Sequence, residues 1–244
     1  MLSTLVIIIT LAIAGFIRGY TGFGFSALVI LVLSAIYPVA QMVPAVLLVD
    51  LIVTLPLVAS SWKQTDFSAL SPLLITTMIG IPCGYWLLFN LPDIALKLLV
   101  PSTVLALAII SRSHSVVLMR VARSPLLCGF MSGWTTSAVS AGGAPVVIYM
   151  RYSQLDIHSQ KNSLISYFFL TTCFAVGSSF AMTQQWYLLP DYPLLYTVIA
   201  GIAVLIGKAC YQYRSLPSLH HAAYYLLLIL SVISMSRVIW TLFS

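Results

Sequence analysis

Long apolar stretches, separated by short polar segments, make up most of the chain. Most of them approach the roughly 20 residues that an α-helix needs to cross a hydrocarbon core about 30 Å thick. They are Leu2–Phe16, Val39–Ala59, Ala69–Phe89, Ile94–Ile110, Leu164–Met182, Leu194–Ala209 and Ala222–Phe243. The pattern predicts an all-α integral membrane protein that lies in a lipid bilayer.

Composition agrees with this fold class. Only 7% of the residues are charged and the mean hydropathy is +1.05, whereas about 25% of the residues in soluble domains are charged. The net charge of +6 does not indicate nucleic-acid binding, because the basic residues form no stripe and lie between apolar stretches. In a membrane protein, basic residues in such positions report orientation.

An internal repeat relates the two halves of the chain. When Gly15 is aligned with Gly133, small residues meet small residues along the glycine-rich segments that follow. After each segment come one short apolar stretch and three longer ones. We therefore expect two repeats, residues 1–110 and 125–244, joined by a basic cytoplasmic linker at 111–124.

Two interpretations of the glycine-rich segments stay open. Small residues allow close helix packing, whereas the positive φ that glycine permits allows a break in the helix. Pro125–Met150 has 26 residues, about 39 Å as one helix, which is too short for two crossings. Its length favours a re-entrant hairpin at 125–150, and we expect a similar hairpin with longer arms at 2–36.

The basic residues test this interpretation. If both hairpins are re-entrant, eight basic residues share one face, which the positive-inside rule makes cytoplasmic, and only Lys97 and Arg237 remain on the other. The eight are Lys63, Arg112, Arg120, Arg123, Arg151, Lys161, Lys208 and Arg214. Both termini are then outside, and the expected crossings are 39–60, 69–89, 94–110, 163–183, 194–211 and 222–243. Three crossings in each half make the halves inverted repeats, a recurring transporter plan.

Several motifs resemble those of the TauE/SafE sulfite-exporter family over nearly the whole chain. Arg18-Gly19-Tyr20-Thr21-Gly22-Phe23-Gly24 resembles its first signature. Gly129–Gly133, followed by Ala141–Tyr149, resembles its second. Lys161 and the pair Tyr167-Phe168 stand where members often carry a basic residue and a Tyr-Phe pair.

The resemblance implies a transporter of small sulfur-containing anions, such as sulfite or organosulfonates, in a bacterial cytoplasmic (inner) membrane. It also has departures. Ala144 replaces a proline, and Thr136, Ser137 and Ser140 stand where glycines are usual. The second hairpin should therefore be stiffer, and these departures leave the choice of substrate open. Transport of another small anionic metabolite is the alternative function.

Arg18 is the most informative polar residue, because it lies in an apolar stretch one turn before the first expected break. An ionisable residue inside a membrane points to function, and guanidinium binds oxyanions in a bidentate manner. The alternatives are that Arg18 extends to the membrane interface or pairs permanently with a carbonyl group.

The two expected breaks complete a candidate anion site. A helix that restarts after a break exposes unpaired N–H groups and the positive end of its dipole, which is where anions bind. The candidate substrate-binding residues are Arg18, Gly19, Thr21, Gly22, Phe23, Gly24, Ser140, Ala141, Gly142 and Gly143. Packing alone is the other explanation of these glycines.

Two further residues are candidates for coupling or gating. Asp50 lies in the middle of an apolar stretch, where it can pair with Arg18, carry a proton, or hydrogen-bond to a neighbouring helix. Lys161 either attracts anions toward the inner mouth of the protein or is a solvated positive-inside lysine.

Other chemistry is less well supported. An enzyme would need a paired acid and base, a nucleophile with its base, or a metal cluster, and the chain has five Asp and no Glu. We expect no metal site at His220-His221, no cofactor, and four unpaired thiols. A cleaved signal peptide is disfavoured, a non-transporting scaffold leaves Arg18 unexplained, and a homodimer stays open.

Overall fold

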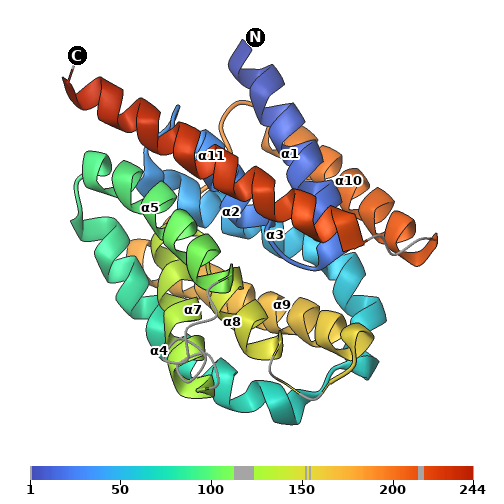
Figure 1. The fold of residues 1–244 in the computed structure, drawn as a ribbon. Coiled ribbons are helices and arrows are strands. Elements are labelled where there is room, and N and C mark those ends of the chain that lie inside the picture. The colour runs from blue at the N-terminus through green and yellow to red at the C-terminus, as the bar shows by residue number, and fades with distance from the viewer. Residues whose placement is uncertain (1, 113–123, 152, 154, 214–216, 244) are drawn as a thin grey trace.

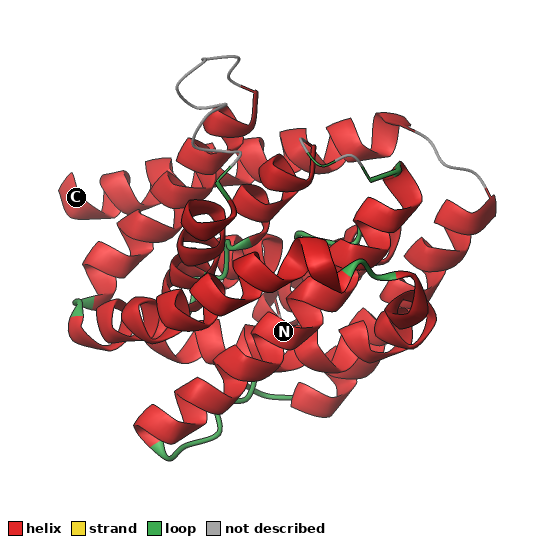
Figure 2. Ribbon diagram, turned by 90° about the horizontal axis from the view of Figure 1, so that it is seen from below, coloured by secondary structure: helices red, strands yellow, loops and turns green. Residues whose placement is uncertain are grey.

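The computed structural model describes residues 2–112, 124–151, 153, 155–213 and 217–243, and every regular element in them is helical (Figure 2). The elements are α1 (Leu2–Thr21), α2 (Phe25–Leu33), α3 (Val39–Ser61), the 3₁₀ turn η1 (Trp62–Gln64), α4 (Phe67–Asn90), α5 (Asp93–Arg112), α7 (Pro125–Val139), α8 (Gly143–Arg151), α9 (Ile157–Thr183), α10 (Pro193–Tyr213) and α11 (Pro217–Phe243).

Six helices in the described part of the chain are long and apolar enough to cross a membrane. They are α1, α3, α4, α5, α9 and α10. The number equals the expected one, but the set differs, because α1 was expected as a hairpin arm and α11 as a crossing. The described apolar part of α11, Tyr224–Trp240, is shorter than the other six. The protein is therefore a multi-pass membrane protein.

Both glycine-rich segments interrupt a helix. Between α1 and α2, Gly22 and Gly24 adopt positive φ values of 86° and 93°, which only glycine takes up readily. Between α7 and α8, Ser140 occupies the left-handed region with φ 56°. The segments after each break are short: α2 and α8 have nine residues each, about 14 Å.

Glycines inside the helices serve the other purpose, close packing. A Cβ atom on Gly15 or Gly19 of α1 would overlap backbone carbonyl groups of α10. A Cβ atom on Gly129 or Gly133 of α7 would do the same with α4. Both interpretations of the glycine-rich segments therefore hold, at different glycines: breaks at Gly22 and Gly24, and packing at the glycines within α1 and α7.

The two halves make matching contacts (Figure 1). Helix α1 of the first half packs along α10 of the second half, and α7 of the second half packs along α4 of the first. Helix α3 contacts α9, α5 contacts α11, and the contact of α3 with α10 matches that of α9 with α4. If α1 to α5 correspond in order to α7 to α11, replacing every helix by its counterpart turns each of these contacts into another contact of the same set. Two repeats related by a two-fold axis would give this pattern.

Basic side chains gather at one end of the helices. Lys208 Nζ donates to Ser60 Oγ over 2.9 Å, and Asn162, next to Lys161, donates to Gln64, next to Lys63, over 2.6 Å. At the opposite end of α3, the Val39 N–H donates to Asp93, which also pairs with Lys97. Lys97 therefore lies away from the three other lysines. The side chains of Arg112 and Arg151, residues Arg120, Arg123 and Arg214, and the linker residues 113–123 lie outside the described part.

Two aspartates determine where helices begin at this basic end. Asp66 caps α4 by accepting from the N–H groups of Ser68 and Ala69, and Asp156 caps α9 in the same way. Side-chain caps satisfy N–H groups that have no partner within the helix. Because of its cap, α9 begins at Ile157, six residues before the expected crossing, and carries Lys161 within the helix.

Candidate functional site

A cavity of about 350 Å³ lies where the two helix breaks meet. Its lining includes ten of the twelve candidate residues: Arg18, Thr21, Phe23, Gly24, Asp50, Ser140, Ala141, Gly142, Gly143 and Lys161. The two breaks touch each other, since a Cβ atom placed on Gly143 would lie 3.7 Å from Phe23 Cδ2. The fold thus brings together residues that are more than a hundred positions apart in the chain.

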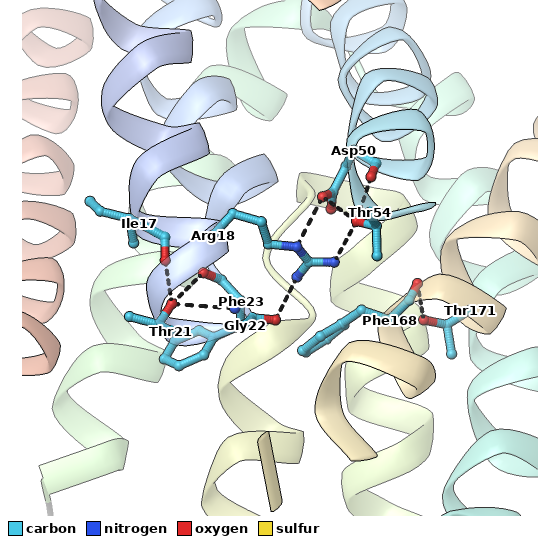
Figure 3. A network of polar contacts seen from close by, with 9 residues as sticks. All are labelled: Ile17, Arg18, Thr21, Gly22, Phe23, Asp50, Thr54, Phe168 and Thr171. Atoms are coloured by element: carbon cyan, nitrogen blue, oxygen red, sulfur yellow. Dashed lines mark hydrogen bonds and ion pairs between the residues drawn. The ribbon is translucent and has the colours of Figure 1, made fainter. Parts of the chain in front are cut away.

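Arg18 is fixed at this cavity by contacts in three directions (Figure 3). Its Nη1 donates to the Gly22 carbonyl oxygen over 2.9 Å, and its Nη2 donates to Thr54 Oγ1 over 3.0 Å. The ring of Phe168 lies 5.2 Å from Cζ, within the range of a cation–π interaction. Only 2% of the residue is exposed, so Arg18 does not extend to the membrane interface.

The carboxylate of Asp50 balances the charge of Arg18. Asp50 Oδ1 lies 3.3 Å from Arg18 Nε, although the Nε–H is not directed well enough to form a hydrogen bond. Thr54 Oγ1 also lies 3.3 Å from this carboxylate oxygen. Of the three roles left open for Asp50, the structure shows the pairing with Arg18.

Arg18 keeps two donors for a ligand. A guanidinium has five N–H donors. Nη1 and Nη2 each use one of theirs in the hydrogen bonds above, and the single Nε–H lies near Asp50 without a hydrogen bond. One N–H on Nη1 and one on Nη2 therefore have no partner among the described residues. Two N–H donors on the terminal nitrogens of one guanidinium can bind a planar or tetrahedral oxyanion together.

The net charge of the cavity comes from Lys161. Among the described residues that line the cavity, the charged ones are Arg18, Asp50 and Lys161, and the first two cancel. Lys161 Nζ donates to the Tyr20 carbonyl oxygen over 2.7 Å and lies 3.2 Å from the centroid of the Tyr211 ring. It is therefore held against the end of α1 and is not a freely solvated lysine.

The free backbone donors at the breaks lie slightly further along the chain than expected. The N–H groups of Gly22 and Phe23 are already bound, to the Arg18 carbonyl and to Thr21 Oγ1. Those of Ser140 and Ala141 bind back to carbonyl groups of α7. The available donors are the N–H groups in the first turns of α2 and α8, which have no partner within a helix.

Ser140 combines a strained backbone with an unused hydroxyl group. The left-handed conformation costs about 1–2 kcal/mol for a residue other than glycine. The residue is 2% exposed and lines the cavity, and its Oγ has no hydrogen-bond partner in the described part of the chain. A buried hydroxyl without a partner is unfavourable, so a polar ligand would satisfy it.

A chain of hydroxyl groups holds the second break in place. Ser132 Oγ donates to the Gly142 carbonyl oxygen over 2.7 Å, and Tyr167 OH donates to Ser132 Oγ over 3.0 Å. Thr77 of α4 also contacts the Tyr167 hydroxyl. Arg18 plays the corresponding part at the first break, where it binds the Gly22 carbonyl.

Two candidates lie outside the cavity, and sequence reasoning missed several residues inside it. Gly19 serves the packing of α1 on α10, and Gly22 contributes the turn and its carbonyl group. The missed lining residues include Ser26, Thr136, Phe168 and Thr172. Ser26 could have been found, because it stands in the first turn of the restarted helix. No group of three potential metal ligands lies together among the described residues.

A multi-pass helical membrane protein with a buried guanidinium between two broken helices has the architecture of a membrane transporter. Comparison with protein families supports this class: the sulfite exporter TauE/SafE family matches residues 7–235. The chain belongs to this family, which is a family of membrane transporters. Neither the curated proteins nor the solved structures give a match.

Proposed function

We propose that the protein is a secondary transporter, working as an exporter, for small sulfur-containing oxyanions such as sulfite or organosulfonates. The observation that carries the proposal is the convergence on one cavity of Arg18, the two restarted helices and the unpartnered Ser140 hydroxyl. All of these groups can donate hydrogen bonds, and every oxygen of an oxyanion can accept them.

Binding would use groups that are already oriented. The two free N–H groups of Arg18 would take two oxygens of the ligand, and the first turns of α2 and α8 would take the others. The breaks end on small residues, which lets the ligand approach the backbone. Phe23 and Phe168 leave an apolar side to the cavity, which suits the carbon substituent of a sulfonate.

We propose that the two broken segments are re-entrant and that the halves are inverted repeats. The short α2, α7 and α8, and the matching contacts of the two halves, support this topology. Both chain ends lie along the upper edge of Figure 1, as an even number of crossings requires. Lys63, Lys161 and Lys208 then mark the cytoplasmic end of the protein in an inner membrane.

Transport would proceed by alternating access, in which the two halves rock around the shared cavity. Export needs no coupling ion, because an inside-negative potential favours the exit of an anion by about 2.3 kcal/mol per charge for each 100 mV. Uptake would require a coupled cation, and Asp50 would then be the group that carries a proton.

Flux into and out of proteoliposomes tests the proposal. Saturable transport of at least one of sulfite, thiosulfate, sulfoacetate and taurine is expected for the wild type. Arg18→Lys should reduce it about tenfold or more, because lysine preserves the charge opposite Asp50 but loses the two-donor geometry. Absence of flux for all four anions, in protein shown to be folded, would refute the proposed substrate class.

Topology has its own test. Labelling of single cysteines near each end of the chain with a membrane-impermeant reagent should place both ends outside the cell. A cytoplasmic C-terminus would contradict the re-entrant arrangement.

A further inference from the structure

A second cavity, here called the vestibule, opens beside the first one. It has a volume of about 630 Å³ and lies at the basic end of the helices. Its polar lining residues include Ser60, Gln64, His158, Lys161, Asn162 and Lys208. The site at Arg18 does not use this space.

Lys161 and Tyr211 separate the two cavities, since both residues line both of them. The ammonium group of Lys161 is held by the Tyr20 carbonyl on one side and by the ring of Tyr211 on the other. The ring of Tyr20 in turn meets that of Tyr211 edge to face, with centroids 5.4 Å apart. A ligand that passes from the vestibule to Arg18 must therefore pass Lys161.

The vestibule carries positive charge without a counter-charge. None of the described residues that line it is acidic, and the ion pairs in the described part of the chain are Arg18–Asp50 and Asp93–Lys97. Lys208 Nζ donates to Ser60 Oγ and to the Pro56 carbonyl oxygen, both neutral, and lines the vestibule together with Lys161. Two neighbouring ammonium groups with neutral partners attract an anion more strongly than the neutralised Arg18 does.

We propose that the vestibule is a second binding site for a small oxyanion, formed by Lys161 and Lys208 with the hydroxyl and amide groups around them. The Lys161 ammonium has three N–H donors and lines both cavities, so beside its bond to the Tyr20 carbonyl it would hold the anion first in the vestibule and then in the inner cavity. This second role rests on the proposed transport function, whereas the binding itself does not.

Thiol modification tests the binding directly and needs no transport. A variant in which the four native cysteines are replaced by alanine carries Gln212→Cys, at a position that lines the vestibule. Its rate of reaction is measured with an anionic reagent, 2-sulfonatoethyl methanethiosulfonate, and with the neutral methyl methanethiosulfonate. Methanesulfonate, which is inert toward thiols, serves as the competing oxyanion.

Adding Lys208→Gln to this variant should lower the ratio of the reaction rate with the anionic reagent to that with the neutral reagent about fivefold, because it removes one nearby charge. Lys63→Gln is the matched control: it removes a charge at the same end, outside the vestibule, and should leave the ratio unchanged. Methanesulfonate should slow both reagents when Lys208 is present and neither in Lys208→Gln.

Equal effects of Lys63→Gln and Lys208→Gln, or absence of protection by methanesulfonate, would overturn the vestibule site. The result is separable from that for transport. Protection without any flux in proteoliposomes would support the anion site in the vestibule and refute the transport function. Saturable flux without protection would support the transport function and refute the anion site in the vestibule.

Discussion

Arg18 Nε lies 3.3 Å from Asp50 Oδ1, and the pair joins the last turn of α1 to the middle of α3. Both residues are almost completely buried. Burying two charges is expensive, and removing one partner of such a pair typically costs about 3–5 kcal/mol because the other charge stays behind. The pair therefore stabilises the fold at the cavity and also sets the charge that a ligand meets there.

The first prediction concerns that charge. Asp50→Asn should shift the preference of the protein toward divalent anions, because the lining would then carry the charges of Arg18 and Lys161 without a carboxylate. One charge at this distance is worth about 1–3 kcal/mol. We expect the ratio of half-saturating concentrations for methanesulfonate and thiosulfate to change tenfold or more.

Thr54→Val is the control for that experiment, since it removes the neighbouring hydroxyl group but no charge. It should affect both anions alike. A parallel change for both anions in Asp50→Asn would show that the carboxylate does not set the charge preference.

The second prediction separates stability from function at the same pair. Arg18→Met alone should lower the melting temperature strongly, because Asp50 loses its counter-charge. The double variant Arg18→Met/Asp50→Leu should recover most of that loss, since apolar pairs often replace buried ion pairs without net cost. Flux should be absent in both variants, and flux in the double variant would remove Arg18 from the binding site.

The third prediction compares two glycines of α10. A Cβ atom on Gly207 would overlap the carbonyl group of Phe16, whereas a Cβ atom on Gly201 meets no atom within 4 Å. Gly207→Ala should destabilise the protein by about 1–3 kcal/mol through overpacking. Gly201→Ala should be neutral or stabilise it by up to about 1 kcal/mol. Thermal unfolding in detergent measures both, and equal melting temperatures would contradict the packing of α1 on α10.

The fourth prediction concerns pH. Hydrogen bonds from the first turn of α4, above all from the Ala69 N–H, hold the pKa of Asp66 below its ordinary value, and Ser159 and its neighbours do the same for the pKa of Asp156. A lowered pKa in the folded state means that the stabilisation is present above the unfolded-state pKa, near 4, and is lost as the pH falls through the folded-state pKa.

The melting temperature should therefore fall on acidification below about pH 4. In Asp66→Asn/Asp156→Asn the caps persist, because asparagine caps helices as well as aspartate does, but they no longer titrate. The double variant should lose less stability between pH 5 and about pH 3. Identical pH profiles for the variant and the wild type would contradict this role of the caps.

The sequence predicted the helices well because long apolar runs in a membrane protein leave few alternatives. It predicted both breaks and placed the first one near Gly22 and Gly24, which do make the turn, but it did not assign a use to each of the other glycines. Packing at Gly19 and a turn at Gly22 need the same missing side chain, so composition cannot separate them. The backbone angles distinguish the two uses, and Ser140 shows that a left-handed position need not be glycine at all.

The sequence predicted the charged residues and the glycines of the candidate site, but it missed several of the other residues that line the cavity. Arg18 and Asp50 are visible because any ionisable residue in an apolar run is conspicuous. That they pair depends on how α1 and α3 pack, which no local pattern records. Thr172 resembles the packing residues around it, and Thr136 and Phe168 stood out only through the family resemblance, so it is the fold that reveals that these residues face the cavity.

The central claim is that Arg18 and both breaks form one anion site. It is tested most directly by measuring the equilibrium affinity of the purified wild type and of the Ser140→Gly variant for the transported anion. Glycine relieves the left-handed backbone, so this variant should be at least as stable as the wild type. It should nevertheless bind the anion about tenfold or more weakly, because a hydrogen bond to a charged ligand is worth about 1.5–3 kcal/mol. Ser179→Ala, at a buried serine outside the cavity, should bind as the wild type does. Unchanged affinity in Ser140→Gly would contradict a site shared by the two breaks.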